Sequence, residues 1–324
     1  MSSTGLRYRS LSSWLKEIFG EPVRKINIDA GLGCPNRNAG LGKSGCIYCN
    51  PRGSGTGASG ISISQQVDRG VSFLSRRYRC NKFIGYFQSY TNTYGDPDQL
   101  AGLYGEALQR SEIVGLAIGT RPDCVPDSIL NLLAELSKDR LVWIEYGLQS
   151  IHSETLNLIR RGHGPDEFFD AVKRTLVRGI PTVVHLILGL PGESSIHMTE
   201  TAKAVAVAGV QGVKLHPLYV IRGTYLEQMY TAGEYLPLTQ EQAAQAVLDV
   251  LKVLPPDMVI HRMTSDPHPE ELVAPLWMLN RAQVRRHLEQ TMIMADFRQG
   301  ADCASGAQGS NRNGSEVRQR KYES

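Results

Sequence analysis

The chain has 324 residues, enough for one domain of roughly 250 residues with extensions, or for two smaller domains. Apolar residues make up 41% and charged residues 21%, which is ordinary for a globular protein and compatible with a sizeable core. The formal net charge of +3 permits a polyanionic partner such as nucleic acid but does not require one.

No apolar run approaches the roughly 18 residues that a membrane-spanning helix needs. The first apolar stretch, at residues 11–19, is interrupted by Lys16 and Glu17 and does not resemble a signal peptide. We therefore expect a cytoplasmic protein without membrane contact. In that compartment the six cysteines stay reduced, so clustered cysteines suggest metal binding or catalysis.

A short amphipathic helix near residues 14–19 opens the chain, and buried-strand patterns then alternate with longer helical segments. The strands are predicted at Val23–Ile28, Phe83–Phe87, Ile113–Ile118, Leu141–Tyr146, Thr182–Leu188 and Val213–Val220. The helices between them are predicted at 65–79, 97–110, 127–138, 165–178 and 195–208, with caps that include Ser64 and Asp96-Pro97. Six successive β–α units imply a parallel sheet with right-handed crossovers. They are too few for an eight-fold barrel, so we predict an α/β fold with an open, partial (β/α)6 barrel.

Further helices are predicted at 225–232, at 240–254 after the capping box Thr239–Gln242, and at 271–296, with a short strand at Met258–Met263. Polar residues and glycine dominate from Gln299, which predicts a disordered tail that includes Cys303. The predicted division is an N-terminal extension (1–22), a partial barrel (23–222), a C-terminal helical extension (223–298) and a tail (299–324).

The strongest functional signal is a cysteine-rich loop directly after the first predicted strand, where parallel α/β folds place active-site loops. Cys46 and Cys49 are separated by two residues, a spacing that lets two thiolates bind one metal centre. Cys34 lies twelve positions before Cys46, across a glycine-rich loop that can wrap around a cluster.

Two interpretations of these cysteines stay open. Structural zinc normally takes four protein ligands, yet the next cysteine is Cys80 and the first histidine is His152, so the fourth ligand would come from far along the chain. The other interpretation is a 4Fe–4S cluster with three protein thiolates and one open iron, where a cosubstrate can bind. Cys80 and Cys124 have no partner at metal-ligand spacing and are interpreted as ordinary thiols.

The three cysteines, Tyr48 before the last of them, and the β–α pattern resemble the radical S-adenosylmethionine (SAM) superfamily. The wide first gap and the Cys34-Pro-Asn-Arg37 start of the loop resemble the YhcC/YtqA-like subgroup. Further stretches similar to this subgroup are Tyr86–Tyr94, Gly119–Asp123, Glu145–Ser150, Arg160–His163, His185–Glu193 and Lys214–Leu218. The resemblance covers about Leu11 to Leu288, and several stretches are also similar to the elongator catalytic subunit and to oxygen-independent coproporphyrinogen oxidase.

The resemblance implies that Cys34, Cys46 and Cys49 bind a 4Fe–4S cluster whose open iron chelates the methionine part of SAM. It implies cofactor contacts from residues at successive strand ends: Tyr48 beside the adenine, Gln88 and Ser89 near the methionyl amino group, and Gln149 and Arg161 at the ribose and carboxylate. An arginine fork suits a carboxylate, although Arg161 could be a solvated cation, Arg160 is a rival, and Gln149 could be a turn residue.

Other predicted cofactor contacts are His185, Glu145, Gly189 and Pro191. His185 stands where some relatives carry aspartate, and it is either a ribose contact or a satisfied core histidine. Glu145 is costly to bury unpaired, so we expect it to face the barrel mouth or a cation. Gly189 and Pro191 form a tight turn that lets the backbone approach a ligand.

Substrate contacts are predicted less sharply. Arg121 and Asp123 could contact substrate or pair with each other, and His216 could reach the same face. The resemblance implies an enzyme that cleaves SAM reductively, with a flavodoxin- or ferredoxin-type electron donor. A wobble uridine of tRNA is the favoured substrate; a small molecule or tetrapyrrole, or a non-catalytic zinc-binding adaptor, is the alternative.

Overall fold

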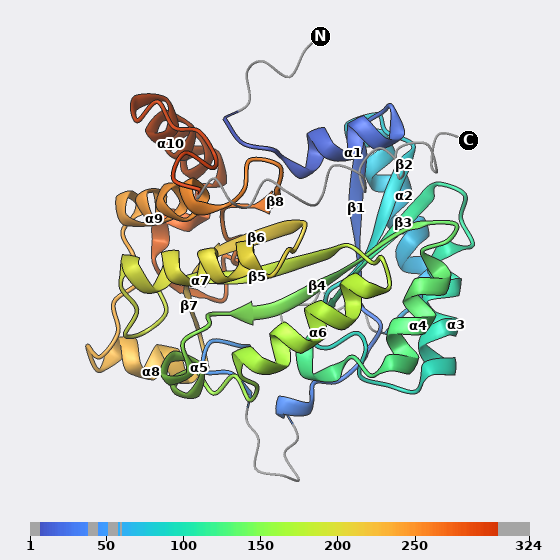
Figure 1. Cartoon of the computed structure of the whole chain (residues 1–324), viewed down its shortest axis with the longest axis horizontal. Coiled ribbons are helices and arrows are strands. Elements are labelled where there is room, and N and C mark those ends of the chain that lie inside the picture. Colours follow the sequence, from blue (N-terminus) through green and yellow to red (C-terminus); the bar gives the residue numbers. More distant parts are fainter. Residues whose placement is uncertain (1–6, 38–44, 51–57, 59, 304–324) are drawn as a thin grey trace.

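The computed structural model describes residues 7–37, 45–50, 58 and 60–303. Seven parallel strands form one curved half-barrel sheet, in the order β1-β2-β3-β4-β5-β6-β8 (Figure 1). The strands are β1 (Val23–Ile28), β2 (Lys82–Phe87), β3 (Ile113–Thr120), β4 (Leu141–Gln149), β5 (Thr182–Leu188), β6 (Gly212–Pro217) and β8 (Val259–Arg262). The predicted partial parallel barrel is therefore confirmed, and the short strand predicted near 258–263 becomes its seventh strand, paired with β6.

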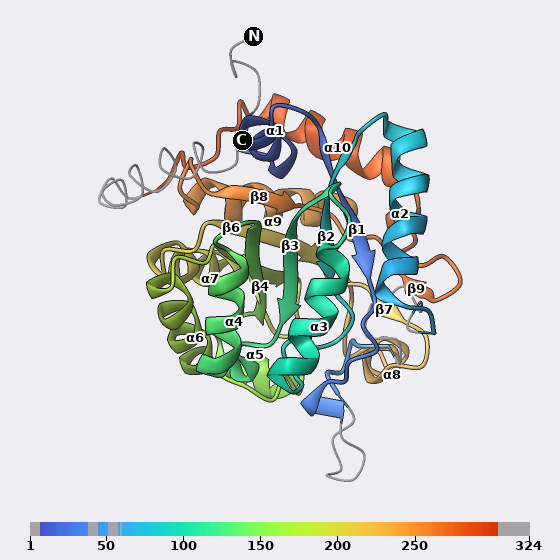
Figure 2. The ribbon, with the colours of Figure 1, turned by 90° about the vertical axis from the view of Figure 1, so that its right-hand side faces the viewer.

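Helices cover the outer face of the sheet, and the largest apolar core lies between the two layers (Figure 2). They are α2 (Ile63–Tyr78), α3 (Pro97–Leu108), α4 (Asp127–Leu136), α6 (Pro165–Val177) and α7 (Ser195–Val207), with the short α5 (Ser153–Leu158) after β4. No helix of the described residues is both long enough and apolar enough to cross a bilayer.

The inner face of the half-barrel is closed at the end where the strands begin. There α1 (Leu11–Phe19) inserts Leu15 against an apolar cluster that includes Ile84 and Trp143. Trp14 meets Trp143 edge to face, with ring centroids 6.3 Å apart. Figure 2 shows α1 at this end of the sheet. The helix therefore covers the interior at the end opposite to the one where the strands finish.

The C-terminal segment departs from the prediction. The helix predicted at 271–296 is wrong in its first part, because residues 272–274 form β9 (Leu272–Ala274), which pairs antiparallel with β7 (Val220–Ile221). Pro275 follows β9, and a 3-10 helix at Leu276–Leu279 precedes α10 (Arg281–Met294). Proline lacks the N–H that a helix interior needs, and Asn280 caps α10 by accepting a hydrogen bond from the Gln283 amide.

Helix α8 (Tyr225–Thr231) and α9 (Gln240–Val253) complete this segment, and α9 packs beside α7. The Thr239 capping box and the Asp96 cap are confirmed. The Ser64 cap is wrong: Ser62 caps α2 with Gln65, while the Ser64 hydroxyl donates to Glu106.

The predicted tail begins too early. The Gln299 side chain is buried and donates to the carbonyl oxygens of Pro255 and Met258. The Asp302 amide donates to the Lys252 carbonyl oxygen. The packed chain therefore reaches Cys303, and residues 304–324 lie outside the described residues.

Gly115 of β3 tests how tightly neighbouring strands meet. A Cβ at this position would lie 2.2 Å from the Leu141 carbonyl oxygen of β4, which is backbone and cannot rotate away. We expect Gly115→Ala to destabilise the fold by about 1–3 kcal/mol. The matched control is Gly102→Ala in α3, where a Cβ meets nothing within 4 Å. Alanine should stabilise this helix position by about 0.5–1 kcal/mol. Urea denaturation of both variants checks the pair, and equal midpoints would contradict it.

Candidate functional site

The predicted site residues gather where the strands of the half-barrel end. The cysteine loop follows β1, Gln88 follows β2, Arg121 follows β3, and Gln149 is the last residue of β4. Helices α5 and α8 lie at this same end (Figure 2). The carboxyl edge of a parallel sheet is where such folds place ligands, so the arrangement fits a binding site.

Two hydrogen-bond donors converge on the Cys46 thiol, one from within the cysteine loop and one from the loop after α5. Asn36 Nδ2 lies 3.5 Å and Arg161 Nη1 lies 3.6 Å from Cys46 Sγ. Asn36 Nδ2 also donates to the Arg160 carbonyl oxygen at 2.7 Å, so it ties the cysteine loop to the loop after α5. Arg161 thus places a cation beside a thiol that the sequence predicts to be a metal ligand.

Arg161 is buried against this loop, whereas its neighbour Arg160 is exposed. Its Nε donates to the Gly147 carbonyl oxygen at 3.1 Å. Burial opposes its charge, but the neighbouring Tyr48 and Cys46 raise the pKa of Arg161 above its ordinary value. Burial, with Cys46 second, raises the pKa of Tyr48 well above its usual range. The structure thus brings Tyr48, Arg161 and Cys46 together and separates Arg160 from them.

Gly147 makes room for two of the predicted cofactor contacts. A Cβ on Gly147 would lie 2.6 Å from Arg161 Nη2 and 2.8 Å from Gln149 Nε2. The pairing with β5 shifts between Gly147 and Gln149, and Gln149 takes a left-handed conformation with φ of 79°. The irregularity turns the Gln149 amide toward Gly147, so the predicted pair meets over one glycine.

Arg121 and Asp123 form a bidentate ion pair, with Arg121 Nε and Nη2 lying 2.9 and 2.8 Å from the two carboxylate oxygens. Arg121 is buried, and its Nη1 and Nη2 also donate to the carbonyl oxygens of Arg161 and Gly162 at 2.8 and 3.0 Å. The guanidinium is therefore committed to holding the loop that carries Arg161. These two residues, predicted as substrate contacts or as a pair, occur as a pair.

Cys49, the third predicted cluster ligand, lies near the other two cysteines. Burial raises the pKa of Cys49, Arg37 lowers it, and the thiols of Cys46 and Cys34 raise it further, so the three cysteines lie within electrostatic reach of one another. Across residues 7–37, 45–50, 58 and 60–303, no three His, Cys, Asp or Glu side chains are placed to ligate one metal ion. A cubane cluster distributes its thiolates over separate iron atoms, and three thiols beside cationic donors fit that requirement. Cluster ligation by these residues stays a prediction.

A second group of polar side chains fills the barrel interior around Glu145, which is fully buried. Its Oε1 accepts hydrogen bonds from Lys25 Nζ at 2.7 Å and Trp143 Nε1 at 2.9 Å. Its Oε2 accepts from His185 Nε2 at 2.8 Å and Lys214 Nζ at 3.2 Å. Each carboxylate oxygen therefore has two donors, which offsets the cost of burying the charge.

These contacts set the charge states of the interior. Burial alone would raise the pKa of Glu145, but Lys214 and Lys25 hold it well below its usual range. Burial, with Lys25 and Arg262 adding to it, lowers the pKa of Lys214 to about 7 against the opposing effect of Glu145. Burial lowers the pKa of His185 to about 4, so this histidine is neutral near pH 7 and donates one N–H.

The remaining predicted contacts are placed as follows. Ser89 is fully buried and its hydroxyl has no hydrogen-bond partner among the described residues, while Gln88 beside it is half-buried. The Gly189 carbonyl oxygen accepts from Tyr235 OH at 2.9 Å, and Pro191 is buried, so that turn is tied to the C-terminal segment. Their contact with SAM stays a prediction.

Several residues of the site escaped the sequence analysis. Asn36, Lys25 and Lys214 each contact a predicted site residue directly. For Lys214 the available signal was a lysine between Val213 and Leu215 in a buried strand, because a buried cation needs a partner. Lys25 follows Arg24 in a strand of mixed polarity and carried no such signal. Asn36 lies in the Cys34–Arg37 stretch that resembles the subgroup, but its contact with the Arg160 carbonyl oxygen, 124 residues away, had no signal in the sequence.

The cysteine loop forms hydrogen bonds with the end of α5 on one side and with the C-terminal segment on the other. The Ile47 amide donates to the Ile159 carbonyl oxygen, and the Leu226 amide of α8 donates to the Ile47 carbonyl oxygen. Asn50 Nδ2 donates to Glu271 Oε2 at 2.7 Å. The loop that carries Cys46 and Cys49 is therefore held from both sides.

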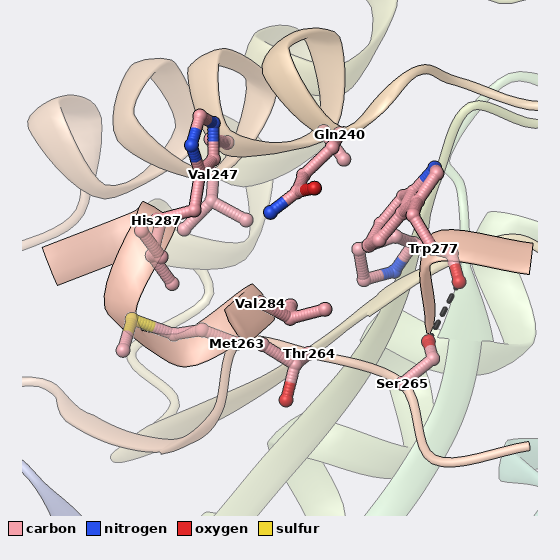
Figure 3. Close-up of a pocket in the computed structure, with 12 residues that line it drawn as sticks. Gln240, Val247, Met263, Thr264, Ser265, Trp277, Val284 and His287 are labelled. Carbon is pink, nitrogen blue, oxygen red and sulfur yellow. Dashed lines mark hydrogen bonds between the residues drawn. The ribbon is translucent and has the colours of Figure 1, made fainter. Parts of the chain in front are cut away.

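A separate small pocket lies outside the barrel, between α9, α10 and the chain after β8 (Figure 3). Val247, Met263 and Trp277 give it a largely apolar lining, and the Ser265 hydroxyl donates to the Pro217 carbonyl oxygen at 2.6 Å. It contains none of the predicted site residues.

Comparison with known proteins agrees with this geometry. The radical SAM superfamily model matches residues 31–205, and the radical SAM C-terminal domain model matches residues 210–293. YtqA of Bacillus subtilis is 37% identical over 285 residues, covering 87% of this chain and 88% of that protein. The chain belongs to the radical SAM superfamily. Its predicted likeness to the YhcC/YtqA-like subgroup is confirmed.

Two further likenesses are more distant. The radical SAM chain is 32% identical to a tRNA uridine(34) acetyltransferase of Methanocaldococcus infernus over 146 residues, which are 44% of this chain and 27% of that protein. The solved structure of archaeal Elp3 from Methanocaldococcus infernus superposes with a TM-score of 0.64 and 18% identity, covering 86% of this chain and 64% of that one. This second likeness concerns the radical SAM fold alone.

Arg121 should act as a positioning residue for Arg161. Arg121→Lys keeps the charge but loses the fork that holds one carboxylate and two carbonyl oxygens, so it should destabilise the protein by about 1.5–3 kcal/mol. Arg160→Lys is the matched control in the supported loop, because Arg160 is exposed. SAM binding to the reconstituted protein, followed by titration, should weaken for Arg121→Lys only. Equal effects of the two substitutions on binding and stability would contradict the positioning role.

Proposed function

We propose that this chain is a radical SAM enzyme that binds a 4Fe–4S cluster through Cys34, Cys46 and Cys49 and cleaves SAM reductively, for modification of a wobble uridine in tRNA. When bound, such a cluster supplies the electron that divides SAM into methionine and a 5′-deoxyadenosyl radical. A flavodoxin- or ferredoxin-type protein is the proposed electron donor.

The observation that carries the proposal is the convergence of Asn36 and Arg161 on the Cys46 thiol at the open end of the half-barrel. A zinc-binding adaptor has no need for a buried guanidinium beside its thiolates. An enzyme that binds SAM does, because the SAM carboxylate requires a fixed cation. Family membership supports the same conclusion, since radical SAM proteins as a class are enzymes.

The chain's own residues then have separate tasks. Arg161 offers its positive charge to a carboxylate, and Gln149 offers an amide that can both donate and accept hydrogen bonds. Both side chains lie over Gly147. Tyr48, which stands between Cys46 and Cys49 in the sequence, offers an aromatic ring on which an adenine can stack. The α1 helix packs against the end of the interior where the strands begin and excludes water from that end.

The tRNA part rests on the partial likeness to a protein named tRNA uridine(34) acetyltransferase, which covers 44% of this chain. The formal net charge of +3 is compatible with an RNA partner. A small-molecule or tetrapyrrole substrate is the second candidate within the same enzyme class.

The cofactor proposal predicts a visible and countable result. Anaerobic reconstitution should give brown protein with about 4 Fe per chain, and dithionite plus SAM should then yield 5′-deoxyadenosine. Replacing Cys34, Cys46 or Cys49 by alanine should abolish that product, while Cys80→Ala, a buried thiol elsewhere in the fold, should not. Colourless protein with one zinc ion, or undiminished 5′-deoxyadenosine from any of the three variants, would contradict the proposal.

The substrate proposal predicts a change in tRNA nucleosides. Cells without the gene should lack or accumulate one modified wobble uridine, detected by mass spectrometry of digested tRNA. A plasmid copy should restore the nucleoside, and the same copy with Cys46→Ala should fail to do so. Unchanged tRNA alongside an altered small-molecule profile would favour the second candidate.

A further inference from the structure

The barrel interior carries more positive than negative charge. Glu145 is its fully buried carboxylate, and Lys25 and Lys214 both bind it, with side chains that are 19% and 8% exposed. Two cations thus share one anion. Both oxygens of Glu145 already accept two hydrogen bonds each, so a further donor would find no good position there.

Arg262, at the end of β8, adds a third cation beside this group. Its charge acts on Tyr86, His216 and Lys214, and a shift in the pairing between β6 and β8 occurs directly before it. Burial lowers the pKa of Arg262, and within the described part of the chain it forms no ion pair. Asp266, the carboxylate that acts on it, is exposed and is bound by Arg281.

The Arg262 guanidinium therefore has N–H groups that are available to a ligand. Its Nε donates to the Thr264 carbonyl oxygen, and no hydrogen bond from Nη1 or Nη2 is recorded among the described residues. A planar guanidinium presents two parallel N–H groups that match the two oxygens of a carboxylate or phosphate.

His216 supplies a second donor at the same place. It stands on β6 with its ring centroid 5.2 Å from that of His185, and its Nε2 is buried with no hydrogen-bond partner in the described residues. Burial and the charge of Arg262 keep this imidazole neutral, so it carries one N–H. With the proton on Nε2, this imidazole presents a buried donor, and an acceptor on a ligand would satisfy it.

We propose that Arg262 and His216 form a site for an oxyanion, a carboxylate or a phosphate, on the substrate, with Lys214 supplying additional positive charge. This proposal rests on the function proposed above, and it deepens that function by requiring an anionic group on the molecule that enters the barrel. The site is distinct from Arg161, which follows β4 and faces Cys46, whereas His216 and Arg262 belong to β6 and β8.

The experiment uses small anions as probes and thermal unfolding as the readout. The reconstituted protein is melted in sodium chloride, sodium acetate and sodium phosphate at equal ionic strength. Acetate stands for a carboxylate source and inorganic phosphate for a phosphate source. One of them should raise the melting temperature by about 2–4 °C over chloride in a saturable way.

Phosphate also stabilises folded proteins through its exclusion from their surface, so variants provide the reference. The rise should disappear in Arg262→Gln and shrink in His216→Phe. Arg222→Gln, an exposed arginine in the same part of the chain, should keep it. Equal melting temperatures in the three salts, or a rise that survives Arg262→Gln, would overturn the site. Because melting needs no turnover, an absence of SAM cleavage by the wild-type protein would sink the proposed function and leave this result standing.

Discussion

A carboxylate with no exposed surface governs the interior of this half-barrel. Glu145 stands in the middle strand of the sheet, and its charge persists there only because donors reach it from β1, β4, β5 and β6. Removing any one donor would leave part of a buried charge uncompensated. The inward faces of these strands are thus fixed relative to one another by a polar contact as well as by apolar packing.

The cysteine loop depends on a different buried charge. Arg161 has no carboxylate partner in its contacts and is held by the Gly147 carbonyl oxygen and the Cys46 thiol. Arg121 holds the backbone beneath it, and Asn36 ties that backbone to the cysteine loop. The result is a cation fixed beside thiols by groups that are mostly neutral, which leaves its charge available for an anionic ligand.

The sequence was sufficient for most of the sheet because buried parallel strands are continuous apolar runs. The run predicted at Val213–Val220 is wrong at its end, because β6 stops at Pro217 and Val220 belongs to β7 in a second sheet. Helix starts were predictable where a cap precedes proline, as at Asp96-Pro97, and failed where two serines competed, as at Ser62 and Ser64. The segment at 272–274 was missed because three residues carry no period, and their strand state depends on β7.

In the candidate site, too, local patterns were predictable and contacts between distant residues were not. Cysteine spacing and polar residues at strand ends are local patterns, and they indicated Cys46, Gln149 and Arg161 before the fold was available. Partnerships are not local: Lys25 and Glu145 are 120 residues apart in the chain, and Asn36 and Arg160 are 124 apart. A polar residue with a distant partner looks the same in the sequence as one facing solvent, so the contacts of Lys25 and Asn36 could not be predicted.

The group of charged residues around Cys46 and the group around Glu145 differ in their charge balance. Around Cys46, the guanidinium of Arg161 complements thiols, and this charge balance would be completed by a bound cluster and its ligand. Around Glu145, Lys25 and Lys214 share one carboxylate, and Arg262 adds a cation near Lys214 on which only the exposed Asp266 acts as a carboxylate among the described residues. Buried charge of one sign is costly unless an opposite charge arrives with a ligand. A half-barrel that is closed by α1 at one end and positively charged within is therefore better suited to an anionic substrate than to a neutral one.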